Sequence, residues 1–368
     1  MQQSPHEPSP ASSPGSPRAG REGDVLAVVS QGGPTVSFFD AASDRHLGTV
    51  EVLAEPHELC FDPTQRLLWC TTTYRAGYYH ANAGRRTELT VIDADTRRIV
   101  EVIDLAPEHG PHGLALDPAR GRLYVSVEGA ADRPGGVVVI DTGTRRPVGR
   151  IDTEAPGPHW FAIDPAGRRG YATNKEAPFV SVVDLEQGVL IEKIEVPGSE
   201  GLAVSPDGAR VYVAAPYALF SAPSGTSEGG GGRPAAGIRV IDARTATVVD
   251  TLPTESAVLP VHLTSTGKLL AGELRMAPDP ASRLGRQTTG RLRVFSAATH
   301  EPLAELAVGR GPLTITSSPD GRIAYVACVA SSTVDLIDLD TMQSLSRLDL
   351  RKHGEAGAHG MAYLPRPA

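Results

Sequence analysis

The segment Gly110-Pro111-His112-Gly113-Leu114-Ala115-Leu116-Asp117-Pro118 recurs along the chain and sets its architecture. Each copy is a short apolar stretch that is entered through Pro or Gly and left through a turn, which is typical of a strand. Close copies begin at Pro56, Pro158, Ser199 and Ala358, and weaker copies begin near Leu259 and Leu313. Seven copies at intervals of a few tens of residues indicate a closed array of equivalent units.

A second marker gives the same number of units. It is a tight turn that follows a β-branched run, and it is headed by Asp40, Asp93, Asp141, Asp184, Asp242, Ser296 and Asp338. An Asp at this position can accept a hydrogen bond from the backbone two residues further on. Between the two markers lies a strand with an aromatic residue, such as residues 122–126, and an outer strand follows the second marker. Each unit therefore comprises four antiparallel strands.

We predict an all-β protein, a seven-bladed β-propeller of four-stranded antiparallel blades. Three N-terminal strands, at residues 24–30, 35–40 and 46–53, have no inner strand before them, and the last copy of the repeat, at residues 359–364, has no strand after it. These four strands are expected to form one blade that closes the ring. The predicted organisation is a single propeller over residues 24–368, preceded by a disordered tail rich in Ser and Pro over residues 1–23.

At this point the chain resembles a known family, the YVTN-type seven-bladed propellers. The family signature is similar to Ser205-Pro206-Asp207-Gly208-Ala209-Arg210-Val211-Tyr212-Val213, and Tyr171-Ala172-Thr173-Asn174 is close to the tetrapeptide that names the family. The resemblance covers residues 24–365 and implies the propeller fold. It does not select a function, because propellers of this kind include enzymes, binding proteins and surface-layer components.

Composition narrows the classes of partner. Of the 368 residues, 39 are Gly and 31 are Pro, which suits a chain with many turns. The net charge of -8 comes without a basic run, which argues against nucleic acid. No apolar run reaches the about 18 residues of a membrane span, so no membrane partner is expected. Three sparse cysteines favour free thiols, and the predicted location is the cytoplasm.

All length variation between units falls in the loop that joins the second strand to the third. The insertions span residues 73–88, 128–136, 214–237 and 273–291. In an antiparallel meander these loops lie at the same end of the blade as the starts of the inner strands. We expect them to form a lid over a site on that face, with residues 214–237 as its most mobile part.

The first polar position of each copy is where we expect the function. Around the ring it is occupied by His359, His57, His112, His159, Glu200, Leu259 and Leu313. Inner strands line the channel of a propeller, so the four imidazoles can converge near its mouth. Imidazole suits iron, copper, zinc and nickel. We predict that the four histidines bind one divalent transition metal ion, with iron or copper favoured and zinc or manganese as alternatives.

Neighbouring residues are candidates for proton transfer and for a second layer around the metal. Glu200 is predicted to be a ligand or the outer partner of a ligand, and Glu200 and Glu128 are candidate acids or bases. Tyr74 and Arg75, on the first insertion, are further catalytic candidates. His262 falls on the opposite side-chain parity from the histidine row and is expected in the core.

A packing role competes with this interpretation, because Pro-His-Gly is a common strand entry in the family that the chain resembles. Four His at seven equivalent positions favour a functional cluster, since His accounts for only 11 of 368 residues. Three functions are open. The first is a metal-dependent oxidoreductase or lyase that acts on a small organic molecule at the channel mouth. The others are a metal-assisted non-redox lyase or lactonase, and a non-catalytic propeller that binds a protein or ligand.

Overall fold

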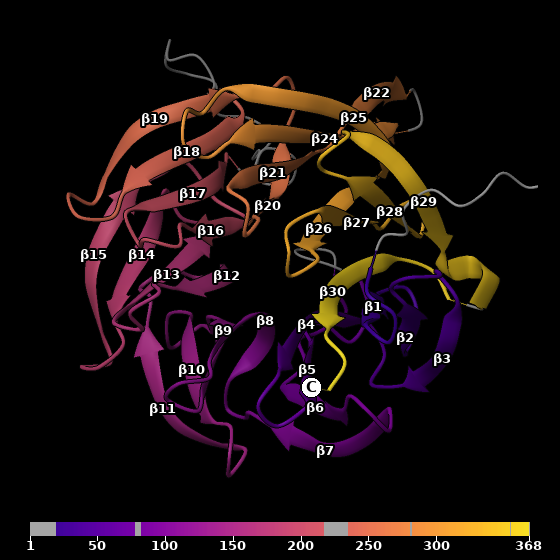
Figure 1. The fold of residues 1–368 in the computed structure, drawn as a ribbon. Helices are drawn as coiled ribbons and strands as arrows, with labels where there is room; N and C mark the ends of the chain where they lie inside the picture. The colour runs from indigo at the N-terminus through magenta and orange to yellow at the C-terminus, as the bar shows by residue number, and fades with distance from the viewer. Residues whose placement is uncertain (1–19, 78–81, 217–234, 280–281, 354, 368) are drawn as a thin grey trace, which may run out of the picture.

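Seven four-stranded antiparallel sheets stand around one axis as the blades of a β-propeller (Figure 1). The computed structural model describes residues 20–77, 82–216, 235–279, 282–353 and 355–367. The first strand of each blade lies next to the axis and the fourth strand forms the rim. The predicted fold class is therefore confirmed.

The first half of the ring comprises the following strands. The N-terminal strands are β1 (Val25–Ser30), β2 (Thr35–Asp40) and β3 (His46–Glu51). The next blade contains β4 (Pro56–Asp62), β5 (Leu67–Thr72), β6 (Glu88–Asp93) and β7 (Arg98–Asp104). It is followed by β8 (His109–Asp117), β9 (Arg122–Glu128), β10 (Gly136–Asp141) and β11 (Arg146–Asp152), and then by β12 (Pro158–Ile163), β13 (Arg169–Asn174), β14 (Phe179–Asp184) and β15 (Val189–Glu195).

The second half continues in the same pattern. One blade contains β16 (Leu202–Val204), β17 (Arg210–Ala215), β18 (Gly237–Asp242) and β19 (Thr247–Pro253). The next contains β20 (Val258–Leu263), β21 (Lys268–Glu273), β24 (Thr289–Ser296) and β25 (Pro302–Arg310). The last complete blade contains β26 (Pro312–Ser317), β27 (Ile323–Cys328), β28 (Thr333–Asp338) and β29 (Gln343–Asp349), and β30 (Ala358–Leu364) ends the chain.

The insertion at residues 273–291 differs from the loop that the sequence predicts. It contains a two-stranded hairpin, β22 (Met276–Asp279) and β23 (Ser282–Gln287), outside the seven blades. Residues 217–234, most of the predicted mobile segment, and residues 1–19 of the predicted tail lie outside the described residues. The described part of the chain has one short helical segment, the 3-10 turn Leu350–His353, and includes no helix long and apolar enough to cross a membrane.

The core lies between neighbouring blades. Its largest members come from the aromatic position of the second strand, which is buried at Trp69, Tyr124, Tyr171, Tyr212 and Tyr325. Each ring packs against the next blade, and burial of apolar surface contributes about 25 cal/mol per Å². Tyr212 also donates a hydrogen bond to the carbonyl of Ala297 in the following blade, at 3.0 Å. The invariant spacing from strand end to aromatic residue is therefore a packing constraint between blades.

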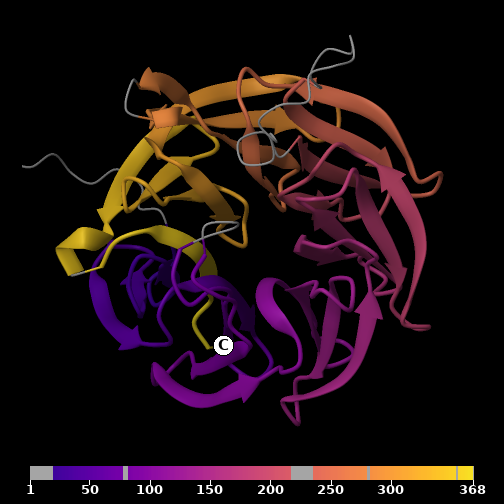
Figure 2. The same cartoon turned by 180° about the vertical axis from the view of Figure 1, so that it is seen from behind.

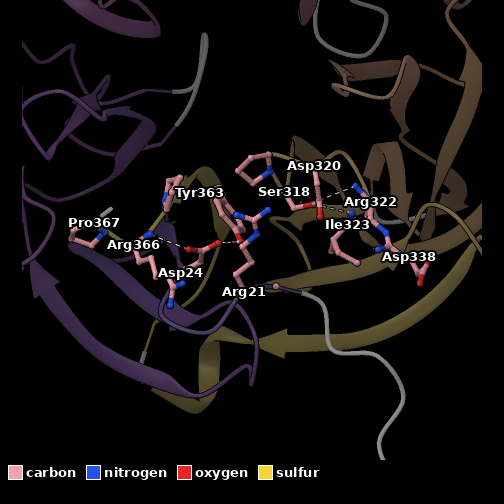
Figure 3. Close-up of a pocket in the computed structure, with 13 residues that line it drawn as sticks. Arg21, Asp24, Ser318, Asp320, Arg322, Ile323, Asp338, Tyr363, Arg366 and Pro367 are labelled. Atoms are coloured by element: carbon pink, nitrogen blue, oxygen red, sulfur yellow. Dashed lines mark hydrogen bonds between the residues drawn. The ribbon is translucent and has the colours of Figure 1, made fainter.

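The two ends of the chain close the ring as predicted. The C-terminal β30 pairs with β1 and becomes the inner strand of the blade formed by β1–β3, and these strands lie side by side in both views (Figures 1 and 2). A buried carboxylate reinforces this closure (Figure 3). Asp24 accepts hydrogen bonds from the Tyr363 hydroxyl at 2.6 Å and from the Arg366 backbone N–H at 2.9 Å.

A pair of substitutions tests the closure. Met361 of β30 is 5% exposed and packs with Leu26 and Tyr325 between the closing blade and the last one. Met361→Ala should lower the free energy of unfolding by about 2–5 kcal/mol in chemical denaturation, because it leaves a cavity at this seam. The control Leu303→Ala, on a rim strand and 48% exposed, should change it by less than about 0.5 kcal/mol. Equal effects of the two substitutions would contradict the closure by β30.

Candidate metal centre

The inner strands that carry histidine begin with a β-bulge. In β4, residues 57–58 together oppose the single residue Thr71 of β5. The same two-against-one pairing recurs at residues 112–113, 159–160 and 359–360. A bulge increases the local twist and re-aims a side chain. It lets the first polar residue of each strand point across the channel while the rest of the strand keeps its pairing.

A hydroxyl group on the neighbouring strand holds each of three bulges. Thr71 Oγ1 accepts a hydrogen bond from the Glu58 N–H at 3.0 Å and donates one to the His112 carbonyl, also at 3.0 Å. Ser126 and Thr173 make the same two kinds of hydrogen bond in the next two blades. Each hydroxyl therefore connects one member of the polar row to the next across a blade boundary.

Close approach of neighbouring blades at the bulge also restricts the following residue. A Cβ added at Gly360 would lie 2.3 Å from the His57 carbonyl oxygen, and one at Gly113 would lie 2.7 Å from the His159 carbonyl oxygen. Both distances are far below a van der Waals contact. The glycine that follows the His thus has a steric cause in these two copies.

The bulges bring the four histidines together. His57, His112, His159 and His359 are each at most 5% exposed. Ring centroids are 4.7 Å apart for His57 and His112, 4.5 Å for His112 and His159, and 4.3 Å for His57 and His359. One ring nitrogen from each of His57, His112 and His159 lies within 4.8 Å of the others, and His57, Glu58 and His359 form a second such group. The predicted convergence at the channel mouth is therefore present.

Three of these imidazoles each have a buried carboxylate beside one ring nitrogen. The pairs, with their nitrogen–oxygen distances, are His112 and Glu128 at 3.2 Å, His159 and Glu200 at 2.6 Å, and His359 and Glu58 at 3.2 Å. His359 Nδ1 also lies 3.1 Å from the His57 carbonyl oxygen. An imidazole N–H that donates to such an acceptor leaves the second ring nitrogen as a lone-pair donor.

His57 has an amide in place of a carboxylate. Its Nδ1 lies 3.1 Å from the Gln31 side-chain amide, which comes from the loop after β1. Its Nε2 is buried and has no hydrogen-bond partner among the described residues, and the same holds for His112 Nδ1. Buried polar atoms without a partner cost about 1–3 kcal/mol each, so their position inside the cluster calls for a ligand.

Glu128, at the end of β9, is the centre of a polar network around His112. It accepts hydrogen bonds from the Tyr74 hydroxyl at 2.6 Å and from Lys175 Nζ at 2.7 Å, and it forms an ion pair with Arg85 Nε at 2.6 Å. Lys175 is 2% exposed. Its ammonium also donates to the Tyr74 oxygen at 3.1 Å. Glu128 is thus surrounded by donors on both carboxylate oxygens.

Electrostatics fix the protonation states of this network. Burial alone would raise the pKa of Glu128, but the Lys175 ammonium and the His112 hydrogen bond hold that pKa far below its usual range. Burial, followed by the charge of Lys175, lowers the pKa of His112 well below its ordinary value. Burial and the neighbouring imidazoles do the same for the pKa of His57. Both imidazoles therefore remain neutral, the form that binds metals, at pH values where an exposed histidine is protonated.

A cavity of about 250 Å³ adjoins the cluster. His57, His359 and Tyr74 lie on one side, and Leu259 and Leu313 on the other. The two leucines occupy the first polar position of the repeat in their own blades. The part of the row without histidine therefore contributes apolar side chains to the cavity.

Three of the four predicted catalytic residues contact a histidine of the cluster, and the fourth, Arg75, does not. Glu200, just before β16, contacts His159, and Glu128 and Tyr74 contact His112. Arg75 is exposed and makes no described side-chain contact with the cluster. Arg85, on the returning arm of the same insertion, contacts Glu128 instead, because Tyr74 and Arg85 are paired in an isolated β-bridge.

Histidines outside the row stay outside the cluster. His262, on β20, is half-buried and lies 2.9 Å from the Ser317 hydroxyl of the next blade, with burial lowering its pKa to about 4. It is the core residue that the sequence predicts. His109 lies 3.2 Å from Arg85 Nη1 at the edge of the network.

Sequence reasoning missed three contributors to the site, namely Gln31, Glu58 and Arg85. Glu58 follows His57 directly, but its role depends on the bulge. The hydroxyls at Thr71, Ser126 and Thr173 were also missed, although each stands two residues after the aromatic position. That spacing is a signal that the sequence could have supplied.

A larger hollow, of about 680 Å³, lies on the opposite face beside the closure (Figure 3). It is lined by tight-turn residues such as Asp320 and Asp338 and by Arg322 and Arg366. Its charged groups make hydrogen bonds within turns or with neighbours, as in Ser318 with Asp320 at 2.6 Å and Arg322 with Asp340 at 2.9 Å. No imidazole lines it, so the histidine cluster remains the candidate site.

The chain is a seven-bladed β-propeller with a cluster of buried imidazoles at its channel mouth. No protein-family model matches it. It is 28% identical over 196 residues to the Uncharacterized protein YncE of Salmonella typhi, which is 52% of this chain and 49% of that protein. It is 24% identical over 302 residues to the Seven-bladed beta-propeller protein Rv1057 of Mycobacterium tuberculosis, which is 82% of this chain and 64% of that protein.

The chain thus spans about half the length of the first relative and just under two thirds of the second. Among solved structures, Kuenenia stuttgartiensis Hydrazine Synthase is similar, with a TM-score of 0.61 and 16% identity over 84% of this chain and 86% of that one. At this identity the likeness concerns the fold alone. These similarities agree with the propeller fold, which by itself does not define a function.

The hydroxyl that holds the bulge can be tested directly. Ser126→Ala should lower the free energy of unfolding by about 1–3 kcal/mol, because it leaves the Gly113 N–H and the His159 carbonyl without their partner. Ser346 is a matched control, since its buried hydroxyl has no hydrogen-bond partner among the described residues. Ser346→Ala should change the stability by less than about 0.5 kcal/mol. A Ser126→Ala protein as stable as the control would contradict the proposed role of the hydroxyl.

Proposed function

We propose that this protein is a metal-dependent enzyme that acts on a small organic molecule at the mouth of the propeller channel. One divalent transition metal ion would be held by His57, His112 and His159, with His359 as a fourth ligand. One observation carries the proposal: each imidazole has a carboxylate, carbonyl or amide partner at one ring nitrogen, and ring nitrogens of His57, His112 and His159 lie within 4.8 Å of one another. Metal-ligating histidines are oriented by outer partners in this way.

The size of the cluster suits a single ion. Ring nitrogens of His57, His112 and His159 lie within 4.8 Å of one another. Two ligands on opposite sides of one ion are about 4.2 Å apart, given bonds of about 2.1 Å. Small rotations of the imidazoles would therefore complete the coordination. His57 would then need its Nδ1–H to face the oxygen of the Gln31 amide, which a half-turn of that amide provides.

The donor set selects the class of metal. Neutral imidazoles suit iron, copper, zinc and nickel, whereas magnesium and calcium require oxygen ligands. We propose iron or copper, with zinc and manganese as the alternatives. When bound, the ion would supply Lewis-acid or redox chemistry at a position that opens toward the cavity. The reaction would accordingly be that of an oxidoreductase or a lyase.

The remaining polar residues would have distinct tasks. Glu200 and Glu128 would orient His159 and His112 and make them more basic toward the ion. Glu128 is a poor candidate for a general base, because Lys175 and Arg85 hold it in its anionic form. Tyr74 has a pKa raised far above its usual value, by burial and then by Glu128, so it stays a neutral phenol beside the cavity. Arg75 would take part in catalysis only if the insertion that carries it changed its conformation.

The type of repeat and the cellular location also belong to the proposal. We infer that the repeat is of the YVTN type, which the buried Tyr171-Ala172-Thr173-Asn174 on β13 supports. We also infer a cytoplasmic location, which the absence of a disulfide among Cys60, Cys70 and Cys328 supports.

Metal content of protein purified without an affinity tag tests the proposal. The protein should bind about one equivalent of iron or copper, measured by mass spectrometry of the elements after reconstitution with iron, copper, manganese and zinc in turn. Glu200→Gln should weaken binding by about 10–100-fold, and His112→Ala should weaken it more, because it removes a ligand. His262→Ala is the control, since it removes a half-buried histidine outside the cluster, and it should keep the metal.

A propeller that uses these histidines for packing predicts the reverse. His112→Ala would then lower the melting temperature as much as His262→Ala does, with no metal to lose. Stoichiometric binding of none of the four metals would show that the proposed function is wrong.

A further inference from the structure

We infer that the substrate is a small, uncharged, mainly apolar molecule that carries one hydrogen-bond donor, such as a hydroxyl group. This inference rests on the proposed function, because it takes the cavity beside the histidine cluster as the substrate site. The wall of this cavity combines aliphatic side chains with a small number of polar ones.

The end of the cavity away from the histidines is aliphatic. Its wall consists of Leu259, Leu274, Leu313, Val329 and Ala330. Leu259 and Leu274 are at most 4% exposed and form one small apolar cluster, against which Leu313 packs. Burial of an apolar ligand surface against such a wall is favourable by about 25 cal/mol per Å². The body of the substrate should therefore be hydrocarbon or aromatic.

The described residues of the lining include no carboxylate, guanidinium or ammonium group. The polar members are His57, His359, Tyr74, Gln31 and Gln287. They are two imidazoles, one phenol and two amides. A carboxylate, phosphate or ammonium group on the body of a ligand would lose its hydration without gaining a counter-ion, which costs several kcal/mol.

The nearby charged groups contact one another or an imidazole. Lys175 and Arg85 both contact Glu128, behind His112, at 2.7 and 2.6 Å. Glu58 lies behind His359 at 3.2 Å. None of these groups lines the cavity. Among the described residues the lining offers a ligand no ammonium or guanidinium group, so the metal ion would supply the positive charge.

Besides His57 Nε2, a second polar atom in the wall lacks a hydrogen-bond partner among the described residues. Gln287 Oε1, on the hairpin strand β23, is buried and accepts no hydrogen bond from the described residues. An amide oxygen in this state is an acceptor for a ligand O–H or N–H. Because Gln287 lies on the hairpin and lines the cavity, the inserted strands would recognise the substrate while the inner strands hold the metal.

The volume limits the size of the ligand. About 250 Å³ corresponds to about eight water molecules at about 30 Å³ each. A single six-membered ring with one short substituent fills such a space. Benzyl alcohol is therefore a suitable neutral probe, with toluene lacking its donor, and benzoate and benzylammonium adding a charge.

Binding of these four probes, measured by ligand-observed NMR on the protein as purified and after removal of metal by a chelator, tests the inference. Benzyl alcohol should bind saturably in both states, and at least about tenfold more tightly than benzoate or benzylammonium in the metal-free state. Gln287→Leu should remove the preference for benzyl alcohol over toluene. Equal or tighter binding of either charged probe in the metal-free protein would overturn the inference.

A cavity-filling variant locates the binding. Leu313→Trp should weaken benzyl alcohol binding by at least about tenfold while leaving the metal content unchanged, because the added ring occupies the aliphatic end. Leu303→Trp, on the exposed rim, is the control and should bind like the parent. Unchanged binding by a folded Leu313→Trp protein would overturn the inference.

The two proposals fail in different ways. Metal bound by the histidines without selective binding of benzyl alcohol would refute the substrate class alone. Selective binding of benzyl alcohol in a protein that takes up no metal would refute the metalloenzyme and leave the cavity as a site for neutral ligands.

Discussion

The β-bulge at the head of the inner strand, held by a hydroxyl of the neighbouring strand, is the constraint on which the site depends. Without it the first polar residue would follow the regular alternation of the strand. With it, residues 57–58 share one partner, Thr71, whose hydroxyl also reaches the His112 carbonyl in the next blade. The same device in successive blades turns a repeated sequence position into a ring of side chains that face one another.

Energetics favour a functional explanation of that ring. Four buried imidazoles, three buried carboxylates and the buried Lys175 are expensive to desolvate, and apolar side chains of similar volume would give a more stable channel. The repeat tolerates an apolar side chain at this position, because Leu259 and Leu313 stand at the equivalent positions of two other blades. A cluster that keeps polar groups where leucine is tolerated is better explained by binding than by packing.

The fold could be predicted because its causes are local and repeated. The Asp turns, the aromatic position and the apolar inner strands recur with fixed spacing. Because the repeats are equivalent, His57, His112, His159 and His359 lie at the same end of the channel. Arg85 could not be predicted, because its contact with Glu128 depends on the path of an insertion. The contact of Lys175 with Glu128 was not predicted either, because it depends on the packing of a second blade. The hairpin β22–β23 was missed for a similar reason, since it lies outside the repeat.

The central claim is that the imidazole cluster is a metal centre, and anomalous diffraction tests it most directly. Crystals of tag-free protein would be measured on both sides of the absorption edge of the metal found in the sample. The account predicts one anomalous peak about 2.1 Å from ring nitrogens of His57, His112 and His159, on the side where His359 completes the cluster. A metal-containing crystal with its anomalous peak elsewhere, and none among these imidazoles, would contradict it.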